Sequence, residues 1–205
     1  MTSVEQQVHL VDDIAPVVAF DFCPSDVTVA LDDNCMANTS MDALGMATAT
    51  ASDNCDMPDA VVTYVDSDTL LGCGPTFEFT RTFTATATDA CGNVATSVSC
   101  SQTITIEDTT APTIDMAAMD ATVECDGSGN AADLDAWLAS NGGASASDAC
   151  SDVTWSNDFA SFSDDCGATG MATVTFTATD DCGNSSSTTA TFTIEDTTAP
   201  SIDMA

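Results

Sequence analysis

Ten cysteines are the residues of this chain with the clearest capacity for chemistry. No two of them have the Cys-x-x-Cys spacing of a zinc or redox motif, and a single histidine, His9, leaves a zinc site short of nitrogen ligands. An even number of cysteines without metal spacing is typical of disulfides formed in an oxidising compartment. We therefore expect disulfides, with free buried thiols as the alternative, at Cys23, Cys35, Cys55, Cys73, Cys91, Cys100, Cys125, Cys150, Cys166 and Cys182.

Short segments of the chain recur in the same order. TIEDTTAP at residues 105–112 returns at 193–200, and TATDACGN at 86–93 returns as TATDDCGN at 177–184. A degenerate version of the first segment, VDDIAP, stands at 11–16. Because the connecting segments repeat more faithfully than the stretches between them, the sequence indicates tandem repeats whose joints are under the stricter constraint.

The joints divide the chain into four expected parts. Residues 1–12 have the pattern of the last strand of a preceding repeat, and 197–205 that of the start of a following one. The two complete repeats are predicted at residues 13–108 and 109–196.

Alternating side chains predict β-strands in both repeats. In residues 77–88, Phe77, Phe79 and Phe83 lie on one face of the expected strand, and threonines lie on the opposite face. Residues 171–179 alternate in the same way. About seven short strands in roughly 90 residues predict an all-β fold of tandem immunoglobulin-like Greek-key β-sandwiches, stapled by disulfides.

One short helix is predicted in the second repeat. Leu134, Trp137 and Leu138 have helical spacing after Asn130, a candidate cap, and Gly142 is a candidate stop. Trp137 is expected to cover the core.

The repeat also suggests how the cysteines pair. Cys55 and Cys91 lie in loops expected at one end of the first sandwich, and Cys150 and Cys182 occupy the same positions in the second. We therefore expect the pairs Cys55–Cys91 and Cys150–Cys182. Cys73 and Cys166 occupy equivalent positions, and the cysteines that remain as their partners are Cys35 and Cys125, which gives Cys35–Cys73 and Cys125–Cys166. Cys23 and Cys100 fall in the first and last strands of the first repeat, which are neighbours, so we expect Cys23–Cys100.

The charge excludes several partners. The chain has 33 acidic residues, one arginine, no lysine and a formal charge of −32. Such a surface repels nucleic acid and anionic membranes and needs cations or salt. No membrane span or signal peptide is visible, and without lysine or a second histidine we expect no enzyme. Arg81 is expected to snorkel or to sit at a bulged strand end, with a buried ion pair as the alternative.

Carboxylates gather near the joints, where calcium is the cation they suit. Calcium takes six to eight oxygen ligands. The alternative is that aspartate only caps turns, because no contiguous calcium-loop spacing is present. The candidate ligands are Asp53, Asp89, Glu107, Asp108 and Asp115 in the first set, and Asp148, Asp180, Glu195, Asp196 and Asp203 in the second.

The combination of TATDxCGN with a following xDTTAP resembles the HYR-like and gliding-adhesin-type repeats of giant secreted surface proteins of Bacteroidetes. The resemblance extends over nearly the whole chain. It implies immunoglobulin-like sandwiches, export by the type IX system, and a place in a surface adhesin or extracellular filament serving adhesion, gliding or prey capture. It also suggests O-glycosylation at Asp-Thr positions, namely Thr69, Thr109 and Thr197.

The expected function is therefore a secreted structural stalk, with neighbouring repeats and other copies of the chain as partners. The alternative is a module that binds carbohydrate or ice. Regular threonine rows, such as Thr80, Thr82 and Thr84, would form the ice-binding face, although threonine also suits any exposed strand.

Overall fold

A computed structural model describes residues 7–163 and 167–202 of the chain, which divide into two compact units. Unit 1 contains the chain up to Ala30, Ala37–Gly72 and Thr76–Glu107. Unit 2 contains Leu31–Met36, Cys73–Pro75 and the chain from Asp108 onward. Two short segments that fall within the first sequence repeat thus belong to the second compact unit.

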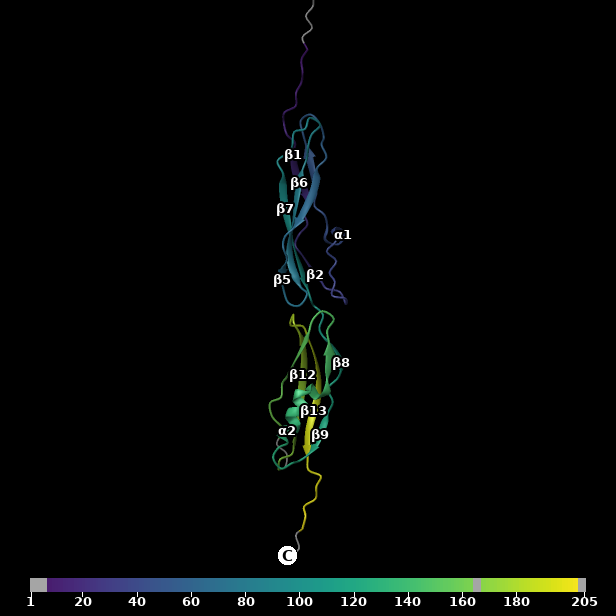
Figure 1. The fold of residues 1–205 in the computed structure, drawn as a ribbon, viewed down its shortest axis with the longest axis vertical. Helices are drawn as coiled ribbons and strands as arrows, with labels where there is room; N and C mark the ends of the chain where they lie inside the picture. Colours follow the sequence, from purple (N-terminus) through teal and green to yellow (C-terminus); the bar gives the residue numbers. More distant parts are fainter. Residues whose placement is uncertain (1–6, 164–166, 203–205) are drawn as a thin grey trace, which may run out of the picture. The chain divides into compact units, whose positions relative to one another are not determined.

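Unit 1 consists of two β-sheets, antiparallel except for the parallel pairing of β2 with β7, and one short helix, α1 (Met41–Leu44) (Figure 1). The larger sheet has the order β2-β7-β6-β4, and β5 also pairs with β6. Its strands are β2 (Val27–Ala30), β4 (Val61–Asp66), β5 (Leu70–Leu71), β6 (Phe77–Thr86) and β7 (Val98–Glu107). The smaller sheet pairs β1 (Val17–Phe22) with β3 (Thr48–Ser52).

The core of unit 1 follows from the alternation of β6. Phe79, Phe83 and Ala85 are buried, whereas the threonines between them face outward. Ala85 shares a hydrophobic cluster with Val18 of β1, and Ala51 of β3 packs against the same cluster. The two sheets therefore bury their apolar faces against each other, as in a β-sandwich.

Unit 2 repeats this plan of a larger and a smaller sheet, but its helix is longer than α1. Its larger sheet has the order β11-β12-β13-β9, and its smaller sheet pairs β8 with β10. These strands are β8 (Thr113–Met116), β9 (Ala121–Glu124), β10 (Ser145–Ser147), β11 (Val153–Asn157), β12 (Gly170–Asp180) and β13 (Ser185–Glu195). A helix, α2 (Ala131–Ala139), and a 3₁₀ turn (Asn141–Gly143) lie between β9 and β10.

Helix α2 closes one side of the core of unit 2. The Trp137 ring lies 5.1 Å from that of Phe176 and 5.4 Å from that of Phe192, and its Nε1–H donates to the Met119 carbonyl at 3.0 Å. Gly142 has φ +63°, and a Cβ there would lie 3.1 Å from both Ala118 and the Phe176 ring. A glycine is thus required where the chain leaves the helix.

The all-β sandwich fold and the helix of the second repeat are confirmed. One detail is corrected: Asn130 precedes the helix, but its side chain makes no capping bond and instead donates to the Glu124 carbonyl and to Asp133. Within the described part of the chain, no helix combines the length and the apolar character needed to span a bilayer.

Candidate functional site

A buried aspartate organises the DACGN turn at one end of unit 1. Asp89 Oδ1 accepts the Asn93 backbone N–H at 2.8 Å, and Oδ2 accepts the Asn93 side-chain amide at 2.7 Å. Burial opposes ionisation, but hydrogen bonds from Asn93 and from the backbone of Cys91 and Gly92 outweigh it, so the pKa of Asp89 is lowered. The Asn93 amide also donates to the Asp12 carbonyl at 3.2 Å, which ties the turn to the VDDIAP joint.

The same arrangement recurs in unit 2. Asp180 accepts the Asn184 backbone N–H and side-chain amide, each at 2.8 Å, and the amide donates to the Asp108 carbonyl at 3.0 Å. In both turns the intervening glycine has φ near +90°, which favours glycine. The joint and the TATDxCGN motif repeat together because each turn binds the backbone of its own joint.

These contacts account for several of the predicted calcium ligands as turn-capping residues. Asp89 and Asp180 are held by asparagine, as described above. Asp53 accepts the Cys55 backbone N–H at 2.9 Å, and Asp148 accepts the Cys150 N–H at 2.8 Å. Asp115 accepts the Ser147 hydroxyl at 3.0 Å.

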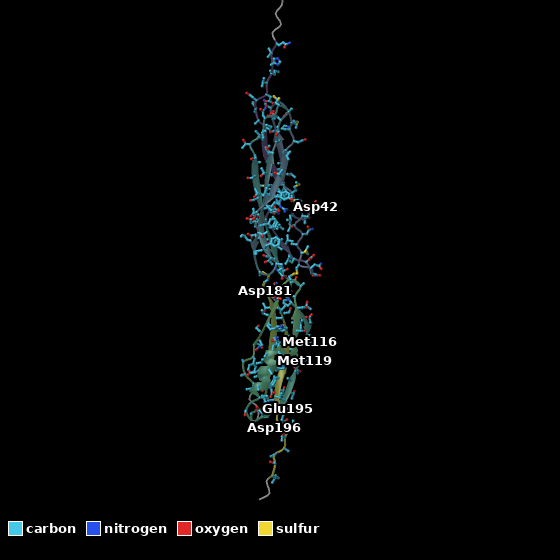
Figure 2. The ribbon with its side chains drawn as sticks, viewed as in Figure 1. Asp42, Met116, Met119, Asp181, Glu195 and Asp196 are labelled. Atoms are coloured by element: carbon cyan, nitrogen blue, oxygen red, sulfur yellow. A yellow bond between two sulfur atoms is a disulfide. The ribbon has the colours of Figure 1, made fainter. Side chains whose placement is uncertain are left out.

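The remaining candidates lie apart from these turns. Glu107 ends β7 and is exposed. Glu195 ends β13 and is also exposed, and Asp196 follows it (Figure 2). Asp196 accepts the Thr198 N–H at 3.0 Å. Asp203 lies outside the described residues.

One predicted ligand, Asp108, stands out because it is only 7% exposed. Its Oδ1 accepts the Thr110 N–H at 3.0 Å, but its buried Oδ2 has no hydrogen-bond partner. Ligand atoms of Asp108, Asp148 and Cys150 lie within 4.8 Å of one another, and Asp12, Asp53 and Cys55 form the corresponding group in unit 1. Asp12 is a member that sequence reasoning missed.

An acidic cavity of about 340 Å³ adjoins Asp148 in unit 2. Asp32 and Asp33 line it together with Asp148, Thr110 and Cys150. Asp32 Oδ1 accepts the backbone N–H groups of Met36 and Asn34, both at 2.9 Å, and these bonds lower the pKa of Asp32. The cavity is therefore lined by three aspartates, and carboxylate oxygens are the donors that a hard cation prefers.

The disulfides differ from most of the expected pairs. Cys23–Cys100 forms in unit 1 with a Cα–Cα distance of 6.4 Å. Cys35 pairs with Cys150 (Cα–Cα 5.2 Å) and not with Cys73, and Cys73 pairs with Cys182 (5.1 Å), which corrects the expected Cys35–Cys73 and Cys150–Cys182 pairs. Cys55 and Cys91 are exposed free thiols and do not form the expected bond with each other. Cys125 is also a free thiol, and Cys166, its expected partner, lies outside the described residues.

The correction has a simple physical reason. Cys35 and Cys73 lie in the two segments of the first repeat that belong to unit 2, so each meets a loop of that unit. Gly74, which follows Cys73, has φ +50°, and a Cβ there would lie 3.4 Å from the Ser151 Cβ and 3.6 Å from the Cys150 carbonyl. Both distances are ordinary contacts, so it is the left-handed backbone after Cys73, and not a lack of space, that favours glycine at this position.

The expected pairs Cys35–Cys73 and Cys125–Cys166 treat Cys35 and Cys125 as equivalent positions of the two repeats, but the loops that follow the first sheet strand align differently. Asp126 Oδ1 accepts the N–H groups two and four residues later, as Asp32 does in its own loop. This correspondence aligns Cys125 with Leu31.

Arg81 forms an ion pair in which the guanidinium is buried and the Asp66 side chain is 36% exposed, which corrects the expectation of a snorkelling side chain. Arg81 is 4% exposed, and its Nε and Nη2 donate to the two carboxylate oxygens of Asp66 at 2.7 and 2.9 Å. The hydrogen bond to Asp66 raises the pKa of Arg81, and the guanidinium lies 4.6 Å from the centre of the Tyr64 ring.

The three threonines of the glycosylation pattern, Thr69, Thr109 and Thr197, are all exposed. The Thr197 hydroxyl donates to Glu124 at 2.8 Å, and Thr198 binds the same carboxylate. These bonds lower the pKa of Glu124.

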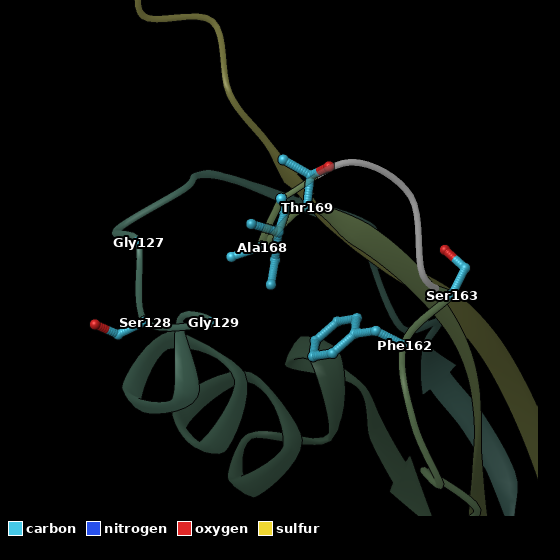
Figure 3. A pocket seen from close by; sticks show the side chains of 9 residues that line it. Gly127, Ser128, Gly129, Phe162, Ser163, Ala168 and Thr169 are labelled. Atoms are coloured by element: carbon cyan, nitrogen blue, oxygen red, sulfur yellow. The ribbon is translucent and has the colours of Figure 1, made fainter.

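A second cavity, of about 420 Å³, lies near the helix of unit 2. Figure 3 shows Phe162 reaching into it from the Ser163 side toward Gly129. The Phe162 ring also packs against Phe159 (5.6 Å) and Phe192 (6.0 Å), so this aromatic side chain contributes to the core.

Comparison with protein-family models finds no match, and neither does comparison with curated proteins. Among solved structures the chain is similar to Drosophila N-cadherin EC1–4, with 15% identity over 89% of this chain and 50% of that one, and a TM-score of 0.30. It is similar to protocadherin gammaB7 EC3–6, with 16% identity over 89% and 53% and a TM-score of 0.34. It is also similar to titin domains I67–I69, with 13% identity over 89% and 67% and a TM-score of 0.30. The chain spans about half the length of the two cadherin chains.

Proposed function

We propose that this chain is a structural segment of an extracellular stalk or filament, in which disulfides join one sequence repeat to the next. The observation that carries the proposal is the pair of bonds Cys35–Cys150 and Cys73–Cys182. Both connect a loop of the first sequence repeat to the body of unit 2. Three separate segments of the chain thus belong to unit 2, and a disulfide bonds each of the first two segments to the third.

This covalent pattern suits a load-bearing role. The two bonds have sequence separations of 115 and 109 residues. In the chain-entropy model, a closed loop of about 100 residues stabilises the folded state by roughly 4.7 kcal/mol. A closed loop also cannot be drawn out by force, because the chain between its sulfur atoms is bypassed.

The same features support a non-enzymatic protein in an oxidising, extracellular compartment. Three disulfides are typical of such a compartment. Arg81, the only arginine of a chain without lysine, is held by Asp66, and the buried Asp89 and Asp180 are held by asparagine. Export by the type IX system and a role in adhesion, gliding or prey capture belong to the proposal through the family resemblance. The partners are neighbouring repeats and other copies, and the charge disfavours nucleic acid.

Single-molecule force spectroscopy tests this function. The oxidised chain, pulled from its two ends, is expected to extend by on the order of 400 Å less than the same chain after reduction, because about 115 residues at roughly 3.4 Å each are bypassed. The double variant Cys35→Ser, Cys73→Ser is the matched control. It keeps Cys23–Cys100, which bypasses 77 residues, so without reductant it should extend further than the oxidised wild-type chain but roughly 260 Å less than the reduced chain. Equal extension of the oxidised wild-type chain and the oxidised double variant would contradict the load-bearing role of Cys35–Cys150 and Cys73–Cys182.

We also propose calcium as the ligand of the acidic cavity in unit 2. The buried Asp108 Oδ2 without a partner and the neighbouring Asp148 supply two anionic oxygens, and Asp32 and Asp33 line the adjoining cavity. An unpaired buried carboxylate oxygen is costly, and a cation removes that cost. The group formed by Asp12 and Asp53 is the corresponding candidate in unit 1.

Ice binding is the second candidate function, supported by one surface. On the outward face of unit 2, Thr175 of β12 lies opposite Thr189 of β13, and Thr177 lies opposite Ser187. These paired positions carry only hydroxyl side chains, and the acidic residues Glu195 and Glu124 stand opposite each other where β13 and β9 end. An ice-recrystallisation assay tests it, and a Thr189→Lys variant should abolish any activity that the face provides. A glycan array separates it from carbohydrate binding.

Glycosylation remains a third proposal. Thr69 and Thr109 are exposed in Asp-Thr sequences, whereas modification of Thr197 would cost its bond to Glu124. The intact mass of the protein from its native source measures the number of attached glycans.

A further inference from the structure

The pair of loops that carries Cys150 and Cys182 in unit 2 has a counterpart in unit 1. In each unit an aspartate accepts the N–H of the first cysteine: Asp53 for Cys55 at 2.9 Å, and Asp148 for Cys150 at 2.8 Å. The residue after that cysteine then binds the second loop. Asp56 accepts the Ala90 N–H at 2.8 Å, and the Ser151 hydroxyl accepts the Asp181 N–H at 3.3 Å.

The surroundings of the cysteines also correspond. Cys55 lies within 4.8 Å of carboxylate oxygens of Asp12 and Asp53, and Cys150 within 4.8 Å of those of Asp108 and Asp148.

The second cysteine of each pair, Cys91 or Cys182, occupies the same place in a DxCGN turn. Both turns have the same asparagine bonds to the buried aspartate and to the joint. The loops therefore present their two sulfur atoms in equivalent settings.

The two units differ in what these sulfur atoms bind. Cys150 and Cys182 are bonded to Cys35 and Cys73, which arrive in segments of the preceding sequence repeat. Cys55 and Cys91 are both exposed and unbonded. Within its described part, unit 1 contains no segment that corresponds to Leu31–Met36 or Cys73–Pro75.

We propose that Cys55 and Cys91 are acceptor sites for two disulfides from a preceding repeat, whose loops carry cysteines as Cys35 and Cys73 do. Each repeat junction of the array would then be crossed by two disulfides. This inference rests on the proposed stalk function. It also explains why Cys55 and Cys91 need not bond to each other, because their counterparts in unit 2 are both bonded outward.

The bond formation requires an oxidant. For each bond, one thiolate attacks oxidised glutathione and releases one reduced glutathione, and the second thiolate displaces the other. Two thiol protons and two electrons thus pass to the oxidant, and one sulfur–sulfur bond forms.

A chain with one added repeat tests the proposal. A copy of residues 12–107, carrying Cys55→Ser and Cys91→Ser, is inserted between residues 11 and 12 of the full chain. The new junction reads Glu-Asp-Asp-Ile-Ala-Pro, which matches the length of the natural Glu-Asp-Thr-Thr-Ala-Pro joint. The control is the same extended chain in which the inserted copy also lacks Cys35 and Cys73. All chains are folded in a glutathione redox buffer.

Non-reducing peptic digestion and mass spectrometry read out the result. In the extended chain, peptides containing Cys55 and Cys35 should be joined, as should peptides containing Cys91 and Cys73. Labelling of Cys55 and Cys91 by N-ethylmaleimide should be complete in the 205-residue chain and in the control, and absent in the extended chain.

Two results would overturn the inference while leaving the stalk function intact. One is a Cys55–Cys91 bond in the 205-residue chain. The other is full labelling of both residues in the extended chain while Cys35–Cys150 and Cys73–Cys182 form. If those two bonds are absent as well, the proposed function and this inference both fail.

Discussion

The Asn184 side chain donates a hydrogen bond of 3.0 Å to the backbone carbonyl of Asp108, which lies 76 residues earlier in the chain. The same amide donates to Asp180, so a single side chain connects the last hairpin of unit 2 to the start of its longest segment. Asn93 performs the same role in unit 1 through the Asp12 carbonyl. The backbone of each joint is therefore held by an asparagine side chain far away in the sequence, in addition to the restriction imposed by the joint's own proline.

Replacing this asparagine should destabilise unit 2. In Asn184→Ala the Asp180 carboxylate and the Asp108 carbonyl both lose a donor, and each buried group left unpaired costs about 1–3 kcal/mol. Thermal unfolding followed by circular dichroism should show a lower Tm. Ser187→Ala, at an exposed position on β13, is the control and should change the Tm little. An unchanged Tm in Asn184→Ala would show that the bond adds nothing to stability.

Acid should destabilise the protein through its hydrogen-bonded carboxylates. The pKa of Asp89 is lowered in the folded protein relative to its ordinary value of 3.8, so the folded state binds the proton less readily than the unfolded state. The stabilisation is therefore complete above this value and is lost as the pH falls below it. The Tm measured between pH 2.5 and 6 should drop steeply at the acidic end. Asn93→Ala should flatten that drop, and an identical pH profile for the variant would contradict the assignment.

Calcium should stabilise unit 2 if it binds at Asp108 and Asp148. Binding to the folded state alone adds about 2.7 kcal/mol at a calcium concentration 100 times the Kd. The Tm should rise in millimolar calcium and fall after chelation, and isothermal titration calorimetry should detect the ion directly. Asp148→Asn should weaken binding at least tenfold, whereas Asp68→Asn, at an exposed position, serves as the control. No calcium-dependent change in either measurement would remove calcium from the proposal.

The ion pair of Arg81 should matter more than an exposed pair. Asp66→Asn leaves the buried guanidinium without its counter-charge. Because the Asp66 side chain is 36% exposed and solvent screens the pair, we expect a cost of about 1–3 kcal/mol. Urea unfolding should show the lower midpoint. The double variant Arg81→Met, Asp66→Asn should recover part of the loss, because it removes the buried charge as well. A double variant less stable than Asp66→Asn would argue against this explanation.

The sequence by itself determined the long strands of this protein and helix α2, but not the short helix α1. In β6 the alternation of Phe79 and Phe83 with threonine has the period of a strand with one buried face, and that period alone predicts which side chains form the core. The helical spacing of Leu134 and Trp137 likewise predicted the helix and its buried face. Local periodicity suffices for these elements because each buries its apolar side chains on one face.

Only the tertiary structure decided the partners of the charged and sulfur-bearing side chains. Arg81 is buried because strand pairing places Asp66 directly opposite it, and a single strand's pattern does not contain that register. Cys150 bonds to Cys35 because a loop of the preceding repeat reaches it. A repeat alignment shows which positions are equivalent, but a disulfide depends on which sulfur atoms meet in space, and here those atoms come from different repeats.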